Sequence, residues 1–240
     1  MDSWSRKIAM FRTLKIGIFG AILGLSSVSK VLGSDPWKIS ETVFDFGAVG
    51  VEYNIFHDFK FTNIGGKVIR IDSVDVKCDC SSVRYEKAVL GPGESVDLKL
   101  TFDTKDFFGP VNRQFNLFLS TPERRVIRFF YLAEVGQWQN GLKPEPFAVF
   151  LLPTLKKQTV KITNRYFESM RAEIMDIQSN LFTVELTNEE VGTNGQLELT
   201  VVADPNLGKG TYQSNFTVKI ITDDEDNPAY LTIPVKIARF

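Results

Sequence analysis

Beyond residue 33, hydrophobic and polar residues alternate with a period of two along most of the chain. In the run from Val96 to Phe102, for example, every second side chain is apolar. This period is typical of β-strands that bury one face, because successive side chains point to opposite faces of a sheet. Turn sequences such as Asn63 to Gly66 and Gly91 to Glu94 separate the runs, and no helix-period segment of useful length follows residue 33. The pattern predicts an all-β protein.

The sequence contains an internal repeat, in which the same order of predicted strands and turns occurs twice. Phe59 to Asn63 recurs as Val160 to Asn164, and Phe115 to Thr121 recurs as Phe216 to Thr222, with an offset of about 100 residues. A repeat of that length is one β-sandwich domain and not a solenoid unit. The sequence therefore predicts two tandem β-sandwich domains, joined by a linker that contains Gly, Asn and Pro. Their expected bounds are 36–135 for domain 1, 136–146 for the linker and 147–240 for domain 2.

Residues 1–33 have the layout of a secretory signal peptide. Four basic residues between Arg6 and Lys15 precede an uncharged stretch of 13 apolar or small residues, Ile16 to Val28. A cut before Ser34 fits this layout, and Ser27 to Ser29 offers a second position. The alternative is an uncleaved signal anchor, although a membrane-spanning helix needs about 20 apolar residues. We expect an extracytoplasmic protein, periplasmic or secreted, with no stable membrane span unless the signal stays uncleaved.

Net charge and the absence of known catalytic motifs exclude several classes of function. Removal of residues 1–33 leaves 23 basic and 28 acidic residues, and an acidic chain is a poor partner for nucleic acid, because phosphate binding needs a basic patch. The chain has a single histidine, His57, and contains no Gly-x-Ser-x-Gly, phosphate-loop or dinucleotide motif. We therefore expect a protein that is not an enzyme, that uses no cofactor, and that binds another envelope or extracellular protein.

Five segments of domain 1 resemble, in order and spacing, a bacterial extracytoplasmic family known as domain of unknown function 1573. They are Phe44 to Val49, His57 to Gly65, Cys78 to Ser81, Leu90 to Ser95 and Leu100 to Thr104. The resemblance covers about residues 41–135, and domain 2 resembles a degenerate relative that lacks the cysteines. It implies an immunoglobulin-like sandwich related to Hydin-type and major-sperm-protein-type domains. The family usually has Cys-Gly-Cys-Thr, whereas this chain has Asp79 and Ser81 in the second and fourth positions.

The candidate site residues are Cys78 and Cys80, the only cysteines of the chain. They can be small buried groups on the inward face that Val74 and Val76 begin, or a disulfide, or a soft metal site for Cu(I) that includes His57. In a flat strand their Cα atoms would lie about 6.5–7 Å apart, so a disulfide would need a local bulge. Two cysteines and one histidine are too few for a four-ligand zinc site.

Two hypotheses for function follow. The first is a non-enzymatic exported module that binds or spaces envelope proteins, and the second is a thiol redox or Cu(I)-handling protein that works through Cys78 and Cys80. Exposed sheet edges are candidate surfaces for strand addition. The last strand contains Pro234 and is expected at such an edge, because proline donates no hydrogen bond to a ladder.

Overall fold

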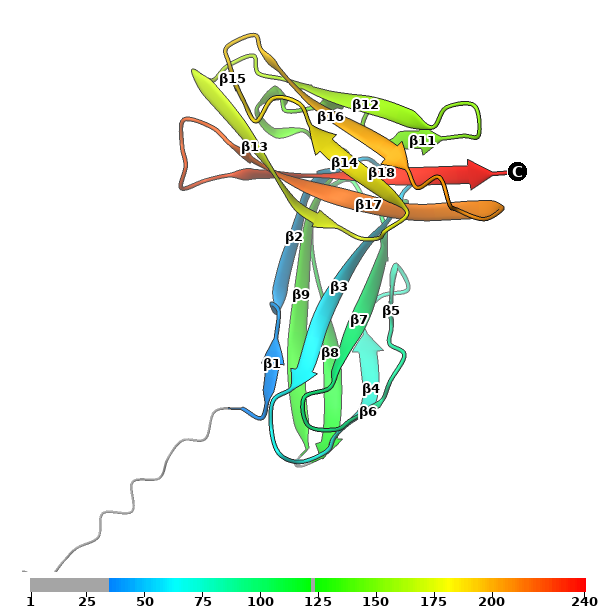
Figure 1. The fold of residues 1–240 in the computed structure, drawn as a ribbon. Coiled ribbons are helices and arrows are strands. Elements are labelled where there is room, and N and C mark those ends of the chain that lie inside the picture. Colours follow the sequence, from blue (N-terminus) through cyan, green and yellow to red (C-terminus); the bar gives the residue numbers. More distant parts are fainter. Residues whose placement is uncertain (1–34, 122–123) are drawn as a thin grey trace, which may run out of the picture. The chain divides into compact units, whose positions relative to one another are not determined.

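The computed structural model describes residues 35–121 and 124–240. The predicted signal peptide, 1–33, lies outside the described residues. Most of the described chain is β-strand (Figure 1), and its helical element is the single 3-10 turn Gln139–Gly141. Within these ranges, no helix has the length and hydrophobicity to cross a bilayer. The prediction of an all-β protein is confirmed.

The strands of the first half form two sheets that pack face to face. One sheet has the order β1 (Trp37–Ile39), β3 (Asn54–Asn63), β7 (Ser95–Asp103), β5 (Ser81–Arg84). The other has the order β2 (Val43–Val49), β9 (Arg125–Val135), β8 (Gly109–Thr121), β4 (Ile69–Val76), β6 (Val89–Leu90). Phenylalanines from both sheets fill the space between them, and the rings of Phe115 and Phe129 stack with centroids 4.8 Å apart.

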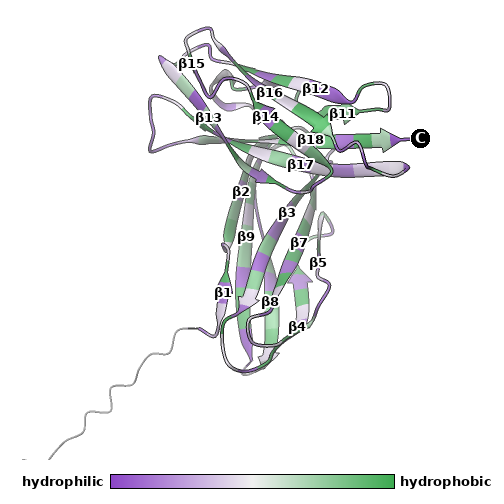
Figure 2. Cartoon of the chain, in the orientation of Figure 1, coloured by the Kyte–Doolittle hydropathy of each residue, from purple (hydrophilic) through white to green (hydrophobic). Residues whose placement is uncertain are grey.

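The second half repeats this arrangement around its own buried cluster. One sheet has the order β10 (Pro144–Glu145), β12 (Lys157–Thr163), β16 (Gln196–Ala203), β14 (Phe182–Leu186). The other contains β15 (Glu190–Gly192), β13 (Ser169–Ile177), β17 (Gly210–Ile221) and β18 (Ala229–Arg239), with β11 (Val149–Leu151) parallel to β18. Figure 2 shows hydrophobic and hydrophilic residues alternating along the strands of both halves, which is the pattern that predicted them.

The segment expected to be a linker takes part in the second half. Strand β10 lies within residues 136–146 and pairs with β12, and Leu142 is buried in the second cluster. A strand of only two residues is too short to produce a visible alternation, so the sequence showed only its Gly and Pro residues. Residues 35–240 group into one compact unit, and the predicted domain boundaries stay a prediction.

The two halves share a sheet. Strand β2 pairs in parallel with β9 and also meets β18, at Leu231 opposite Ala48, so that ten strands are joined into one sheet. The expectation that Pro234 lies on an edge strand is therefore wrong, because β18 has β17 on one side and β2 and β11 on the other. Pro234 falls between the residues that pair with β2 and those that pair with β11, at a break in the ladder where proline is tolerated.

Gly47 allows β2 to approach β18. Its φ is +62°, and a Cβ built on it would lie 1.9 Å from the backbone oxygen of Tyr230, a separation that no side chain can occupy. The Gly47 N–H donates to Asp45 Oδ1 at 2.7 Å, and the pairing of β2 with β9 shifts register between Asp45 and Ala48. Thr232 Oγ1, which is buried, donates to the backbone oxygen of Phe46 at 2.6 Å. Residues 45–48 thus form a bulge that requires glycine.

The repeated Thr-Asn pair has the same structural role in both halves. Asn63 is fully buried, and its Nδ2 donates to the backbone oxygens of Lys67 and Leu90 at 2.8 and 2.9 Å. Asn164, also fully buried, donates from Nδ2 to the oxygens of Phe167 and Val191 at 3.0 and 3.4 Å. Each asparagine also accepts one backbone N–H at Oδ1, at 3.0 Å in both halves. One amide therefore bonds both to the turn that follows the strand and to a neighbouring short strand, β6 in the first half and β15 in the second.

Replacement of Gly47 by alanine is expected to destabilise the fold by about 3–5 kcal/mol, the sum of a positive-φ penalty and a backbone clash. Two glycines serve as controls, because neither Gly66 nor Gly93 has an atom within 4 Å of the position that a Cβ would occupy, and only Gly93 has a positive φ, +80°. We expect Gly93→Ala to cost about 1–2 kcal/mol and Gly66→Ala about 0.5 kcal/mol or less. Urea unfolding of the three variants measures this order, and equal losses at Gly47 and Gly93 would contradict the clash.

Replacement of Asn63 by alanine is expected to lower the free energy of unfolding by about 2–4 kcal/mol, because the buried carbonyl of Leu90 and the partly buried carbonyl of Lys67 lose their donor. The control is Asn112→Ala at an exposed position of β8, for which we expect a change of about 0.5 kcal/mol or less. The measurement is the urea midpoint of each variant. An Asn63→Ala midpoint as high as that of the control would show that water replaces the lost amide.

Candidate functional site

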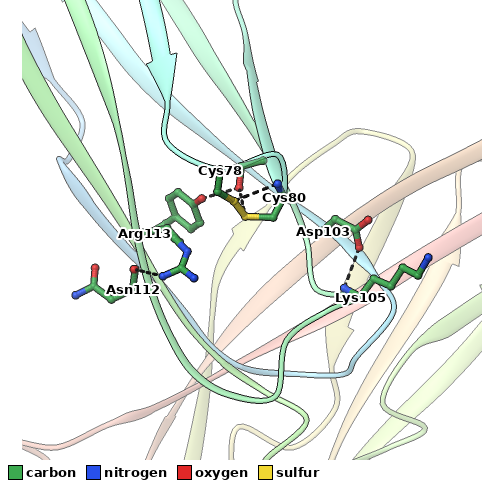
Figure 3. Close-up of a disulfide and its surroundings, with 8 residues drawn as sticks. Cys78, Cys80, Asp103, Lys105, Asn112 and Arg113 are labelled. Carbon is green, nitrogen blue, oxygen red and sulfur yellow. Dashed lines mark hydrogen bonds between the residues drawn. A yellow bond between two sulfur atoms is a disulfide. The ribbon is translucent and has the colours of Figure 1, made fainter.

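Cys78 and Cys80 lie in the turn between β4 and β5 and are joined in a disulfide (Figure 3). The assumption of a continuous flat strand is wrong, because β4 ends at Val76 and the backbone turns over residues 77–80; Cys80 nevertheless packs against the same buried cluster as Val74 and Val76, and Cys78 does not. The turn brings their Cα atoms to 5.2 Å, within the range of ordinary disulfides and closer than an extended strand would allow. Asp79, between them, is exposed.

The two sulfurs have different surroundings. Both residues are half-buried, but only Cys80 packs against the buried cluster of the first half. The Cys80 N–H donates to Cys78 Sγ at 3.1 Å, and Cys80 Sγ lies 3.6 Å from the hydroxyl of Ser81. That hydroxyl is 2.5 Å from the phenol oxygen of Tyr131. A chain of hydrogen-bonding groups thus runs from Cys80 into the core.

The phenol of Tyr131 stays protonated at neutral pH. Burial raises the pKa of Tyr131 above its usual value, while the hydrogen bond with Ser81 and the positive charge of Arg113 lower it in part. The guanidinium of Arg113 lies over the ring of Phe107 at 5.4 Å, and it donates to the backbone oxygen of Asn112 at 3.1 Å. Figure 3 shows Arg113 and Lys105 among the residues that surround the disulfide.

The structure does not bring His57 together with the cysteines. The ring of His57 is buried, its Nδ1 lies 2.8 Å from Asp176 Oδ2, and its Nε2 lies 3.1 Å from Glu41 Oε1. The ring also stacks on Phe44 with centroids 3.6 Å apart. Both ring nitrogens therefore have carboxylate partners, which agrees with a satisfied buried histidine and does not support a Cu(I) site that joins His57 to Cys78 and Cys80.

A groove that sequence reasoning did not find lies where β3, β11, β17 and β18 meet. Its volume is about 400 Å³, and its lining comes from four stretches of chain, 51–54, 147–150, 213–214 and 234–236. Phe147 and Phe150 keep 39 % and 45 % of their surface exposed there. Tyr53 meets Phe147 edge to face at 6.2 Å, and burial, followed by the charge of Glu52, raises the pKa of Tyr53. No local signal marks a site that is assembled from such distant segments.

Hydrogen bonds beside the groove join the segments that line it. Phe56 N–H donates to Oδ1 of the buried Asn215 at 2.6 Å, which joins β3 to β17. Asn54 Nδ2 donates to Gln213 Oε1 at 3.4 Å across the same pair of strands. Thr104, which is fully buried, donates to the oxygen of Gly50 at 3.0 Å and accepts from the N–H of Tyr53 at 3.0 Å. These bonds hold the walls in place.

Metal binding has no support in the described geometry. Within residues 35–121 and 124–240, no group of three or more His, Cys, Asp and Glu side chains is arranged to hold a metal ion.

Three solved structures are among those to which the chain is similar. A protein of unknown function from Porphyromonas gingivalis is 15 % identical over 85 % of this chain and 100 % of its own, with a TM-score of 0.33. The YadV chaperone is 11 % identical, the match covers 83 % of this chain and 99 % of the chaperone, and the TM-score is 0.35. The VesB protease of Vibrio cholerae is 14 % identical over 42 % of this chain, with a TM-score of 0.37, and the match spans only 32 % of the protease.

Comparison with families of known sequence is more specific. Curated proteins give no match. Residues 37–130 match the family described as a protein of unknown function, DUF1573, and this segment contains all five of the motifs that suggested the resemblance. Over residues 37–130, the chain is therefore similar to the DUF1573 family.

Proposed function

We propose that the protein is exported and acts, without catalysing a reaction, as a binding module for another protein of the bacterial envelope. The observation that carries this proposal is the groove, in which the exposed rings of Phe147 and Phe150 stand beside amide and charged side chains. Apolar surface that is rimmed by polar groups is typical of protein interaction sites.

The groove suits an extended peptide segment. A volume of about 400 Å³ accommodates a few side chains and is too small for a folded domain. Asn54 and Gln213 each carry donors and acceptors beyond the bond that they share, so they can bind a peptide backbone. Glu52 and Lys236 supply opposite charges, which favours an occupant held by apolar side chains and backbone bonds over a strongly charged one. The occupant we infer is an uncharged, apolar stretch of a partner protein.

The chemistry of the titratable groups supports binding over catalysis. The single histidine is held between two carboxylates, and the cysteines are bonded to each other. A nucleophile beside a free general base, which is the usual arrangement for acyl transfer, does not arise from these residues.

Export is supported by the disulfide as well as by the N-terminal sequence. Disulfides form and persist in oxidising compartments such as the periplasm, and thiols stay reduced in the cytosol. An extracytoplasmic protein with a disulfide in a surface turn is consistent with this rule.

The first prediction of the proposal concerns the mature chain. Protein isolated from the extracytoplasmic fraction of its native cell is expected to begin at Ser34 and to take up alkyl groups only after reduction, because both thiols are bonded. Intact mass spectrometry before and after alkylation measures both properties. A mass that includes residues 1–33 would establish the signal anchor instead, and two alkyl groups without reductant would contradict the disulfide.

The second prediction concerns the groove. A photoreactive amino acid in place of Phe150 is expected to give one main adduct with an extracytoplasmic protein in intact cells, since this ring borders the groove. The matched control is the same amino acid in place of Tyr166, an aromatic residue that is 70 % exposed and not part of the groove.

The adduct at position 150 is also expected to fall about tenfold when Phe147 is changed to alanine, because hot-spot aromatics commonly contribute more than about 1 kcal/mol to binding. Adduct yield on a gel and the identity of the partner by mass spectrometry are the measurements. Equal labelling at positions 150 and 166 would refute the groove as a binding site.

A further inference from the structure

We propose that the Cys78–Cys80 disulfide is a second functional site, which exchanges with a dithiol of another protein. Cys78 Sγ is the atom that the incoming thiolate attacks, and Cys80 Sγ is the leaving group. This goes beyond the proposed binding function, since it concerns the turn between β4 and β5 and not the groove.

The position of the disulfide argues against a purely structural role. A disulfide stabilises a fold mainly by closing a long loop of the unfolded chain, and this one closes a loop of only three residues. The strands on either side are already held by their ladders, β4 by β8 and β5 by β7. Reduction of the disulfide is therefore expected to destabilise the fold only slightly, so the bond can open and close reversibly in the folded protein.

The surroundings of the two sulfurs give the reaction a direction. Cys80 packs on the core and Cys78 does not, so an incoming thiolate reaches Cys78 Sγ first. Cys80 Sγ then departs toward the Ser81 hydroxyl, 3.6 Å away, which is itself in contact with the Tyr131 phenol at 2.5 Å. Hydrogen-bond donors stabilise the charged form of an acid, and a more stable thiolate leaves faster.

The electrons and protons balance without another reagent. One thiolate of the partner forms a bond with Cys78 Sγ, the bond between Cys78 and Cys80 breaks, and its electron pair remains on Cys80 Sγ. The second thiolate of the partner then attacks the partner's first sulfur, which is bonded to Cys78 Sγ in the mixed disulfide, and Cys78 leaves as a thiolate. The partner dithiol has lost two electrons and two protons to become a disulfide, and Cys78 and Cys80 have gained them. The reverse sequence reduces a partner disulfide.

The test compares Ser81→Ala with Ser82→Ala in the mature protein. Ser82 is an exposed neighbour on β5 and serves as the matched control. In glutathione redox buffers we expect both the disulfide and the dithiol form of the unaltered protein to be populated, whereas structural disulfides resist the glutathione pool. Ser81→Ala is expected to shift this equilibrium about tenfold toward the disulfide, because the Cys80 thiolate loses its donor, and Ser82→Ala is expected to leave it unchanged.

Further readouts separate this role from a merely structural one. In the reduced protein, the midpoint pH for alkylation of Cys80 is expected to rise in Ser81→Ala and, by a smaller amount, in Tyr131→Phe. Among single-cysteine variants, Cys80→Ser is expected to form a mixed disulfide with glutathione faster than Cys78→Ser. A pair that stays fully oxidised in every glutathione buffer, or identical equilibria and alkylation midpoints in Ser81→Ala and Ser82→Ala, would overturn the proposal.

Discussion

The shared sheet depends on one close approach of backbones, at Gly47. Tyr230 O occupies the space that a Cβ would need, and the positive φ of the glycine places Phe46 O where Thr232 can donate to it. With β2 held there, one strand pairs with β9 in the first half and with β18 in the second. The break in the ladder around Pro234, and the groove beside it, exist because β2 and β11 share the same side of β18.

The features that the sequence predicted correctly are those set by interactions within single strands and turns. The alternation of apolar and polar residues identified strands in both halves, because a half-buried strand leaves a period of two whatever its neighbours are. The repeated Asn63 and Asn164 were visible for the same reason, since each satisfies a turn within its own half. Strand pairing between the two halves cannot be recognised in this way, because edge strands and interior strands show the same alternation. Pro234 therefore suggested an edge strand, whereas β18 lies inside a sheet.

The candidate site was predictable only in part. The spacing of Cys78 and Cys80 singled them out, but whether the backbone between them is flat or turned depends on where β4 ends, and a flat strand was the wrong assumption. Ser81 and Tyr131 are 50 residues apart in the chain, so no sequence motif predicts their contact. The same holds for His57, whose partner Asp176 belongs to the other half.

The disulfide turn and the groove meet at two consecutive residues. Asp103 N–H donates to the backbone oxygen of Cys80 at 2.8 Å, and the next residue, Thr104, is bonded to Gly50 and Tyr53 at the wall of the groove. Proximity alone does not couple two sites, because coupling requires an element with two alternative states that both sites bias. The disulfide and dithiol forms of the turn would be two such states. The bonds of Asp103 and Thr104 thus give the turn and the groove a shared segment at the end of β7, and a binding constant that differs between the two redox forms would be the measure of coupling through it.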